Sequence, residues 1–73
     1  MPIVQVQMIR GRTAAQKRRL IAELTRVMAE VAGVSPERVT VVILEVEGES
    51  WGRGGEPLSD YPVATEAEAN AAR

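Results

Sequence analysis

The segment from Val39 to Val46 is apolar at positions that face both sides of a strand. Four aliphatic residues follow one another in its centre: Val41, Val42, Ile43 and Leu44. A strand buried on both faces belongs inside a sheet that is covered on each side. A chain of 73 residues, 45% of them hydrophobic, hides too little surface to supply that cover alone. The segment therefore predicts a strand in a chain that oligomerises.

A strand and a long helix are expected before that segment. Residues Pro2–Ile9 are apolar apart from two alternating glutamines, a pattern typical of a strand. Thr13 and Gln16 have the spacing of a capping box, and Gly33 is a natural helix end. Between them, apolar residues recur at helical intervals as one stripe: Leu20, Ile21, Leu24, Val27, Met28 and Val31. The pattern predicts a helix over residues 14–32. Four charged residues are expected largely on its solvent side: Lys17, Arg18, Glu23 and Arg26.

The order strand, helix, strand predicts a β-α-β unit in which strands 2–9 and 39–46 pair in parallel. A short turn joins the helix to the second strand, with Ser35 as its cap and Pro36 at the first helical position. Two strands alone make a marginal sheet, so partner chains are expected to extend it or cover it.

The remaining chain is richer in glycine. Residues 47–57 hold four of the six glycines and predict a hairpin or loop. A tail over 58–73 follows, in which Val63–Arg73 is rich in Ala and Glu and is a candidate short helix. We expect one α/β domain over 1–73, completed by oligomerisation.

The composition narrows the classes of function. The chain has no Cys and no His, so it lacks disulfides, thiolate metal sites and the commonest general base. A net charge of −1 indicates no bulk preference for nucleic acid or an anionic membrane. Neither a signal peptide nor a membrane span is expected, so a soluble cytoplasmic protein without metal or cofactor is the default.

An enzyme without His or Cys needs another base, and the amine of an N-terminal Pro2 is a candidate. An α-amino group has a reference pKa of about 7.7–8.0, and burial or neighbouring cations favour its neutral form. The neutral amine can accept a proton near neutral pH. Removal of Met1 is the condition, and it is expected because the next residue is small. The alternative is a Met-Pro start with no catalytic meaning.

Arg10 and Arg12 flank Gly11 just before the expected helix. Backbone N–H groups at a helix N-terminus attract an anion, and two arginines would complete a carboxylate site. The alternative is that both arginines are solvated loop residues. Lys17 and the neighbouring pair Arg18-Arg19 are more simply a solvated helix face.

Trp51 is the only Trp and lies among glycines rather than in an apolar stripe. It is a candidate wall of an active site or a candidate plug of a subunit interface. The following residues, Gly52-Arg53-Gly54-Gly55, lack the spacing of a phosphate-binding loop. Four glutamates nearby lack obvious metal-site spacing and are expected at a solvated strand end: Glu45, Glu47, Glu49 and Glu56.

These features resemble the 4-oxalocrotonate tautomerase family. The resemblance rests on Pro2-Ile3, on Gly11-Arg12-Thr13 at the strand-to-helix turn, and on Trp51-Gly52-x-Gly54-Gly55. It covers roughly Pro2 to Glu56. It implies hexamers built as trimers of dimers, or related trimers of doubled chains. It also implies that Pro2 shuttles a proton in a small enol or dienol acid, that Arg12 binds a substrate carboxylate, and that Trp51 forms a hydrophobic wall.

The sequence departs from the family at one position. Founding members carry a second arginine early in the second strand, given to a neighbouring subunit's site, where this chain has Thr40. Arg38, two residues earlier, is a replacement if the strand already runs there, and Arg53 or Arg10 are others. A site without that arginine should hold a dicarboxylate such as 4-oxalocrotonate less well.

The stretch Gly55–Tyr61 also looks like one subunit type of the heteromeric 3-chloroacrylate dehalogenases of the same superfamily. That subunit has a water-activating Glu just after its aromatic wall residue, whereas Gly52 and Arg53 follow Trp51 here. Hydrolytic dehalogenation by this chain alone is therefore not expected. Two alternatives to a tautomerase stay open: a subunit of a hetero-oligomeric hydratase or dehalogenase, and a structural subunit with a vestigial site.

Overall fold

A computed structural model describes residues 1–59 of the chain. Its elements, in chain order, are β1 (Ile3–Ile9), α1 (Ala14–Ala32), the 3₁₀ turn η1 (Pro36–Arg38), β2 (Thr40–Val46), the 3₁₀ turn η2 (Gly48–Ser50), β3 (Gly52–Arg53) and β4 (Glu56–Pro57). Each of the two long strands begins one residue later than expected. The expected short helix at Val63–Arg73 lies outside the described residues.

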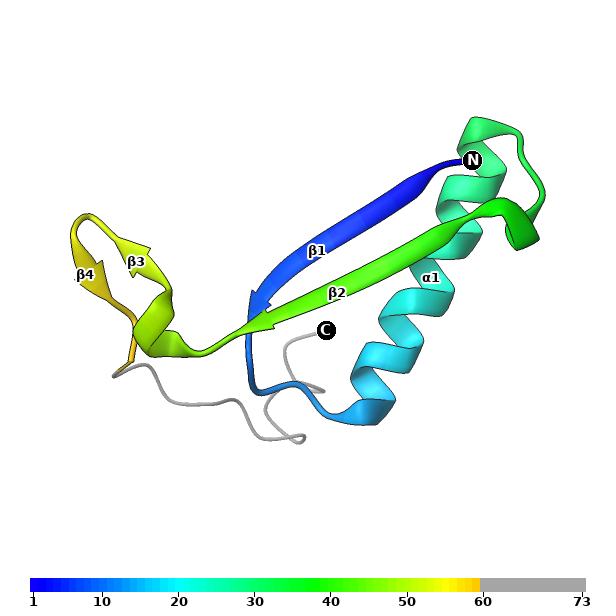
Figure 1. The fold of residues 1–73 in the computed structure, drawn as a ribbon. Coiled ribbons are helices and arrows are strands. Elements are labelled where there is room, and N and C mark those ends of the chain that lie inside the picture. Colours follow the sequence, from blue (N-terminus) through cyan, green and yellow to red (C-terminus); the bar gives the residue numbers. More distant parts are fainter. Residues whose placement is uncertain (60–73) are drawn as a thin grey trace.

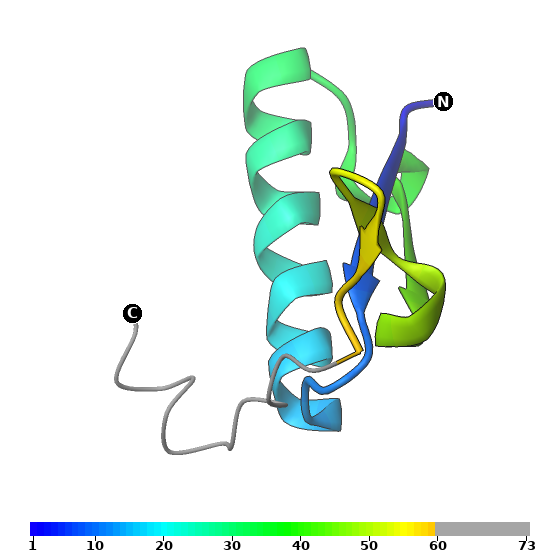
Figure 2. The same ribbon diagram turned by 90° about the vertical axis from the view of Figure 1, so that its left-hand side faces the viewer.

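The strands β1 and β2 pair in parallel, from Ile3 opposite Thr40 to Ile9 opposite Val46. The helix α1 runs along one face of this pair (Figures 1 and 2). The β3–β4 hairpin follows the far end of β2 and is antiparallel. The predicted fold class, a parallel β-α-β unit with a C-terminal hairpin, is confirmed.

The ends of α1 form through the predicted local signals. The Gln16 backbone N–H donates to Thr13 Oγ1 over 3.1 Å, and the Thr13 N–H donates to Gln16 Oε1 over 2.8 Å. This reciprocal box satisfies two N–H groups that have no partner within the helix. At the other end, Gly33 has φ 71°, and its N–H donates to Ala29 O over 3.0 Å. The helix therefore begins and ends at the expected residues.

The sheet has one face toward α1 and one face that no described element covers. Along β1, side chains alternate between half-buried and exposed, as the two-residue period of a strand requires. Residues on the uncovered face are Ile3, Gln5, Gln7, Thr40, Val42 and Leu44. Ile3 is 65% exposed and Leu44 40% exposed. Within one chain, β2 therefore has cover on only one of its two apolar faces.

The apolar stripe of α1 divides into two parts. Leu20, Leu24 and Met28 are half-buried. Ile21, Val27 and Val31 are exposed, and Val31 keeps 79% of its accessible surface. The expected stripe is therefore present on α1, but only part of it packs within one chain. The stripe is wider than a sheet of two strands covers, so its outer part is left facing solvent.

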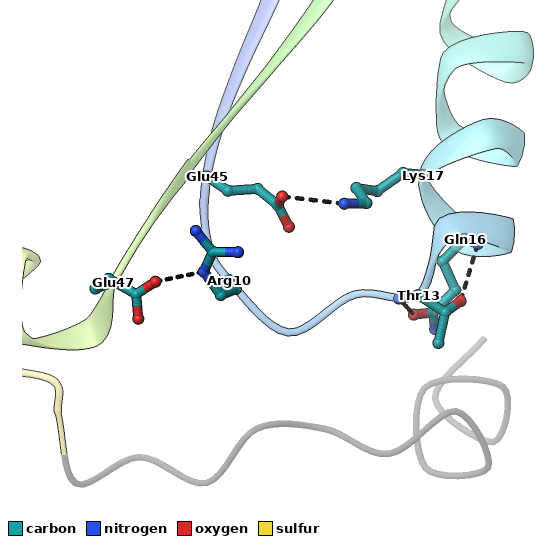
Figure 3. Close-up of polar contacts among 6 residues, drawn as sticks. All are labelled: Arg10, Thr13, Gln16, Lys17, Glu45 and Glu47. Carbon is teal, nitrogen blue, oxygen red and sulfur yellow. Dashed lines mark hydrogen bonds and ion pairs between the residues drawn. The ribbon is translucent and has the colours of Figure 1, made fainter.

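Lys17 and Glu45 were both expected to be solvated, and this is corrected because their side chains are largely buried and lie against each other. Lys17 Nζ lies 3.0 Å from Glu45 Oε1, and the two side chains are 31% and 19% exposed. The pair joins the first turns of α1 to the end of β2 (Figure 3). Removing one partner would leave the other charge partly desolvated, which costs more than an exposed pair contributes.

The short turn before β2 forms as expected, but Ser35 does not cap it. The Ser35 side chain makes no capping bond, and its hydroxyl instead donates to the Glu37 carboxylate. Arg38 ends η1 and donates its N–H to Ser35 O over 2.9 Å, so it belongs to the turn rather than to β2.

The predicted glycine-rich hairpin forms over β3 and β4. Arg53 pairs with Glu56, and the two residues between them are Gly54 with φ 63° and Gly55 with φ 88°. A two-residue hairpin turn with positive φ at both positions is a type I′ turn, which side chains other than Gly and Asn rarely allow. This pair of glycines therefore determines where the chain reverses.

Candidate active site

Pro2 lies immediately before β1 and is half-buried. Its carbonyl oxygen accepts a hydrogen bond of 3.0 Å from the Thr40 N–H, which continues the parallel ladder by one step. Met1, which precedes it, is 85% exposed. The pyrrolidine ring is thus held at the amino end of the sheet, while the residue bonded to its nitrogen extends into solvent.

Arg12 lies in the connection between β1 and α1. The preceding Gly11 has φ 144°, which lets the chain turn from the strand toward the helix. The Arg12 side chain is exposed and makes no ion pair with another residue in 1–59. It is therefore a cation whose donors are available to an anionic ligand.

Arg10 is engaged by its own chain. Its backbone N–H donates to Val46 O over 2.9 Å, and its guanidinium pairs with the Glu47 carboxylate (Figure 3). Both side chains are more than half exposed, so this pair contributes little stability but offsets the charge of Arg10. Of the two arginines, Arg12 is the one without a carboxylate partner in residues 1–59, and an anion site that also uses Arg10 stays a prediction.

Trp51 follows η2 and is half-buried. Both of its backbone polar groups are bonded, since its N–H donates to Gly48 O and its carbonyl accepts from the Leu58 N–H. Arg53 is exposed on β3, opposite Glu56. The indole is therefore attached to a well-bonded backbone, whereas Arg53 lies on the exposed hairpin.

The candidate residues fall at two ends of the sheet. Pro2, Arg38 and Thr40 lie at its amino end, and Arg12 and Trp51 lie beyond its carboxyl end (Figure 1). The seven residues of β1 separate the ends by roughly 20 Å, at about 3.3 Å per residue. One chain therefore does not bring Pro2 and Arg12 into one site. A site that uses both needs at least two chains.

Two contacts at the carboxyl end leave no local signal in the sequence. The pairs of Lys17 with Glu45 and of Arg10 with Glu47 join residues 28 and 37 positions apart, beyond any local periodicity. These pairs account for two of the four clustered glutamates. Within residues 1–59, no three acidic side chains lie together as a metal site would require. In the same part of the chain, no helix has the length and hydropathy needed to cross a membrane.

Known proteins of similar sequence show the family to which the chain belongs. A sequence model of the family described as "Tautomerase enzyme" matches residues 2–61. A 2-hydroxymuconate tautomerase from Pseudomonas sp. (strain CF600) is 44% identical over 59 residues, covering 81% of this chain and 94% of the relative. The chain therefore belongs to the tautomerase family, in its 4-oxalocrotonate tautomerase group, and is an enzyme of the isomerase class.

Two solved structures extend the comparison. A heterohexamer 4-oxalocrotonate tautomerase from Chloroflexus aurantiacus has a TM-score of 0.79 at 27% identity, over 85% of this chain and 100% of that chain. A structure described by its trans-3-chloroacrylic acid dehalogenase activity has a TM-score of 0.71 at 40% identity. The match covers 78% of this chain and 98% of that chain. The β-α-β unit with its hairpin is thus similar to solved members with different chemistry.

Proposed function

We propose that the chain moves a proton within a small enol or dienol acid, with the free amine of Pro2 as the base and then the acid. The main support is the position of Pro2. The hydrogen bond from the Thr40 N–H holds it at the start of the β1–β2 ladder. The family match that begins at residue 2 agrees with this role. Loss of Met1 would convert the Pro2 nitrogen from an amide, which is no base, into a secondary amine.

The reaction needs few groups. The neutral Pro2 nitrogen takes the hydroxyl proton of the enol and returns a proton to a carbon of the same molecule, so the keto acid forms without net proton uptake. Arg12 binds the substrate carboxylate by charge-assisted hydrogen bonds. Trp51 covers the conjugated carbons and keeps water from the transferred proton. A cation near the developing enolate lowers the barrier.

The site is proposed to be shared between chains, because Pro2 and Arg12 lie at opposite ends of β1. Two exposed apolar surfaces support association: the uncovered sheet face around Ile3 and Leu44, and the outer part of the helix stripe around Val31. The assembly we favour is a hexamer of identical chains in the cytoplasm, with a mixed oligomer of two related chains as the alternative.

Association is testable in solution. We expect the purified chain to sediment as an oligomer at micromolar concentration, because a monomer would expose both apolar surfaces. Analytical ultracentrifugation measures the mass directly. A folded species of one chain's mass would contradict the shared site. Copurification of a second short chain would instead favour the mixed oligomer.

The function itself is tested by pairing intact mass with an enzyme assay. We expect the active protein to lack Met1, and we expect it to convert phenylenolpyruvate or 2-hydroxymuconate to the keto form, followed by ultraviolet absorbance. Protein that retains Met1 and is fully active would exclude the amine mechanism. Protein with a free Pro2 amine and no turnover of either acid would exclude the tautomerase function.

A second candidate function is hydration or dehalogenation as one subunit of a mixed oligomer. The 40% identity to the structure with trans-3-chloroacrylic acid dehalogenase activity favours it. Gly52 and Arg53 at the positions after Trp51 argue against a water-activating carboxylate in this chain. Chloride release from 3-chloroacrylate by a mixed oligomer of this chain with a copurified second short chain, and not by this chain alone, would support this candidate over simple isomerisation. A non-catalytic subunit, suggested by Thr40, would show neither reaction.

A further inference from the structure

Leu58 differs from the rest of the described chain in its burial. The residue is 8% exposed, and no other residue in 1–59 reaches the same degree of burial. It follows β4 directly and lies ten positions beyond Gly48. A chain that leaves most of its apolar residues half-buried therefore buries one leucine at the base of its hairpin.

The Leu58 backbone closes that hairpin onto Trp51. Its N–H lies 2.9 Å from Trp51 O and 3.1 Å from Gly48 O, so it is shared between two carbonyls. Gly48 O also accepts the Trp51 N–H over 3.2 Å. Both backbone polar groups of Trp51 are thus held within one small set of bonds.

Gly48 is required at this crossing for a steric reason. A Cβ added there would lie 2.8 Å from Leu58 O and 3.1 Å from the Cα of Ser59. Both are backbone atoms, so no flexible side chain can move aside. Gly52 is different, because the nearest atom to a Cβ built there is Glu56 O at 3.8 Å, an ordinary contact. The chain therefore passes over Gly48 at a distance that only glycine permits.

We infer that Leu58 is a positioning residue for Trp51, acting through a clasp formed by Gly48, Trp51 and Leu58. The buried Leu58 side chain holds the returning chain against Gly48, and the shared N–H then sets the backbone from which the indole projects. Its effect on substrate rests on the proposed function of Trp51 as the wall of the site. The position of the indole itself does not depend on that function.

Trp51 is the only tryptophan, so the tryptophan fluorescence of the protein reports the surroundings of this indole. In Gly48→Ala and in Leu58→Ala, we expect the Trp51 emission to shift to longer wavelength as the indole gains water. We expect KM for phenylenolpyruvate to rise roughly three- to tenfold, the ratio that one net hydrogen bond corresponds to, with a smaller change in kcat. Far-UV circular dichroism and sedimentation measure whether the β-α-β unit and its assembly persist.

Two matched variants separate positioning from general damage. Gly52→Ala adds the same methyl group one residue after Trp51 without a close contact, and Leu58→Met keeps the buried volume. Both should retain the parent's emission and KM. If Gly48→Ala fails to fold, the comparison of Leu58→Ala with Leu58→Met decides the matter.

Unchanged emission and KM in Gly48→Ala and Leu58→Ala would overturn the clasp, as would equal effects in Gly52→Ala or Leu58→Met. Failure of the proposed function has a different signature. An emission shift in the clasp variants, together with no turnover by the parent carrying a free Pro2 amine, supports the clasp and overturns the tautomerase function.

Discussion

A chain whose Pro2 nitrogen is blocked by an N-terminal peptide tag is expected to lose roughly 10²–10⁴-fold in kcat, the usual contribution of a general base. The tag turns the amine into an amide, which cannot take the enol proton. Arg12 and Trp51 remain, so substrate should still bind. The measurement is ketonisation of phenylenolpyruvate by the tagged protein, with an enol-acid titration of Trp51 fluorescence to follow binding.

The matched control carries the same tag at the opposite terminus. It should have the activity of untagged protein, and both tagged proteins should sediment with the same mass. Pro2→Ala gives an intermediate result, because it keeps an N-terminal amine that is primary and more mobile, so kcat falls and some activity survives. Full activity with the amine blocked would remove Pro2 from the mechanism.

Arg12→Ala is expected to lower kcat/KM by about one to two decades, because a charge-assisted carboxylate contact contributes about 1.5–3 kcal/mol. Most of the loss should appear in KM if Arg12 only anchors the substrate. Arg12→Lys should recover part of it, since an ammonium keeps the charge but not the planar fork of donors. Steady-state kinetics on one enol acid supplies all these values.

Arg10→Ala is the control for Arg12, because Arg10 already pairs with Glu47 and its side chain is 62% exposed. A milder effect is expected there. An equal loss in the two variants would mean that the local charge, rather than one arginine, holds the substrate. Unchanged kinetics in both Arg12→Ala and Pro2→Ala would leave the family assignment intact and remove the enzyme mechanism proposed here.

Because β1 separates Pro2 from Arg12, the shared site can be tested by mixing two variant chains in one oligomer. Chains with Pro2→Ala and chains with Arg12→Ala are each expected to be impaired when alone. In hybrid oligomers, a site can take its native Pro2 from one variant and its native Arg12 from the other. With random mixing, about a quarter of the sites then hold both native residues. Activity no higher than the average of the two variants would show that the site is not shared.

Local sequence signals were sufficient for the elements of this chain. Thr13 and Gln16 bond each other across one helical turn, and Gly33 ends the helix with its own backbone, so neighbours in the sequence determine α1. Gly54 and Gly55 likewise define the hairpin turn through their positive φ. The apolar patterns of β1 and β2 were enough to predict the two strands, and the helix between them was enough to predict their parallel pairing.

The tertiary structure decided what those elements bring together. The fold places Lys17 of α1 beside Glu45 of β2, and it places Arg10 beside Glu47, which follows β2. The clasp at Leu58 depends on a crossing of two backbones that leaves no periodic signal.

The sequence by itself determined the chemical groups, a proline after Met1, an arginine before the helix and one tryptophan among glycines. Only the tertiary structure paired Lys17 with Glu45 and brought Leu58 back onto Gly48 and Trp51. The physical reason is that caps and turns are bonds between residues a few positions apart, which sequence spacing records directly. Distances across a sheet depend on strand length and register, which are settled only when distant segments pair.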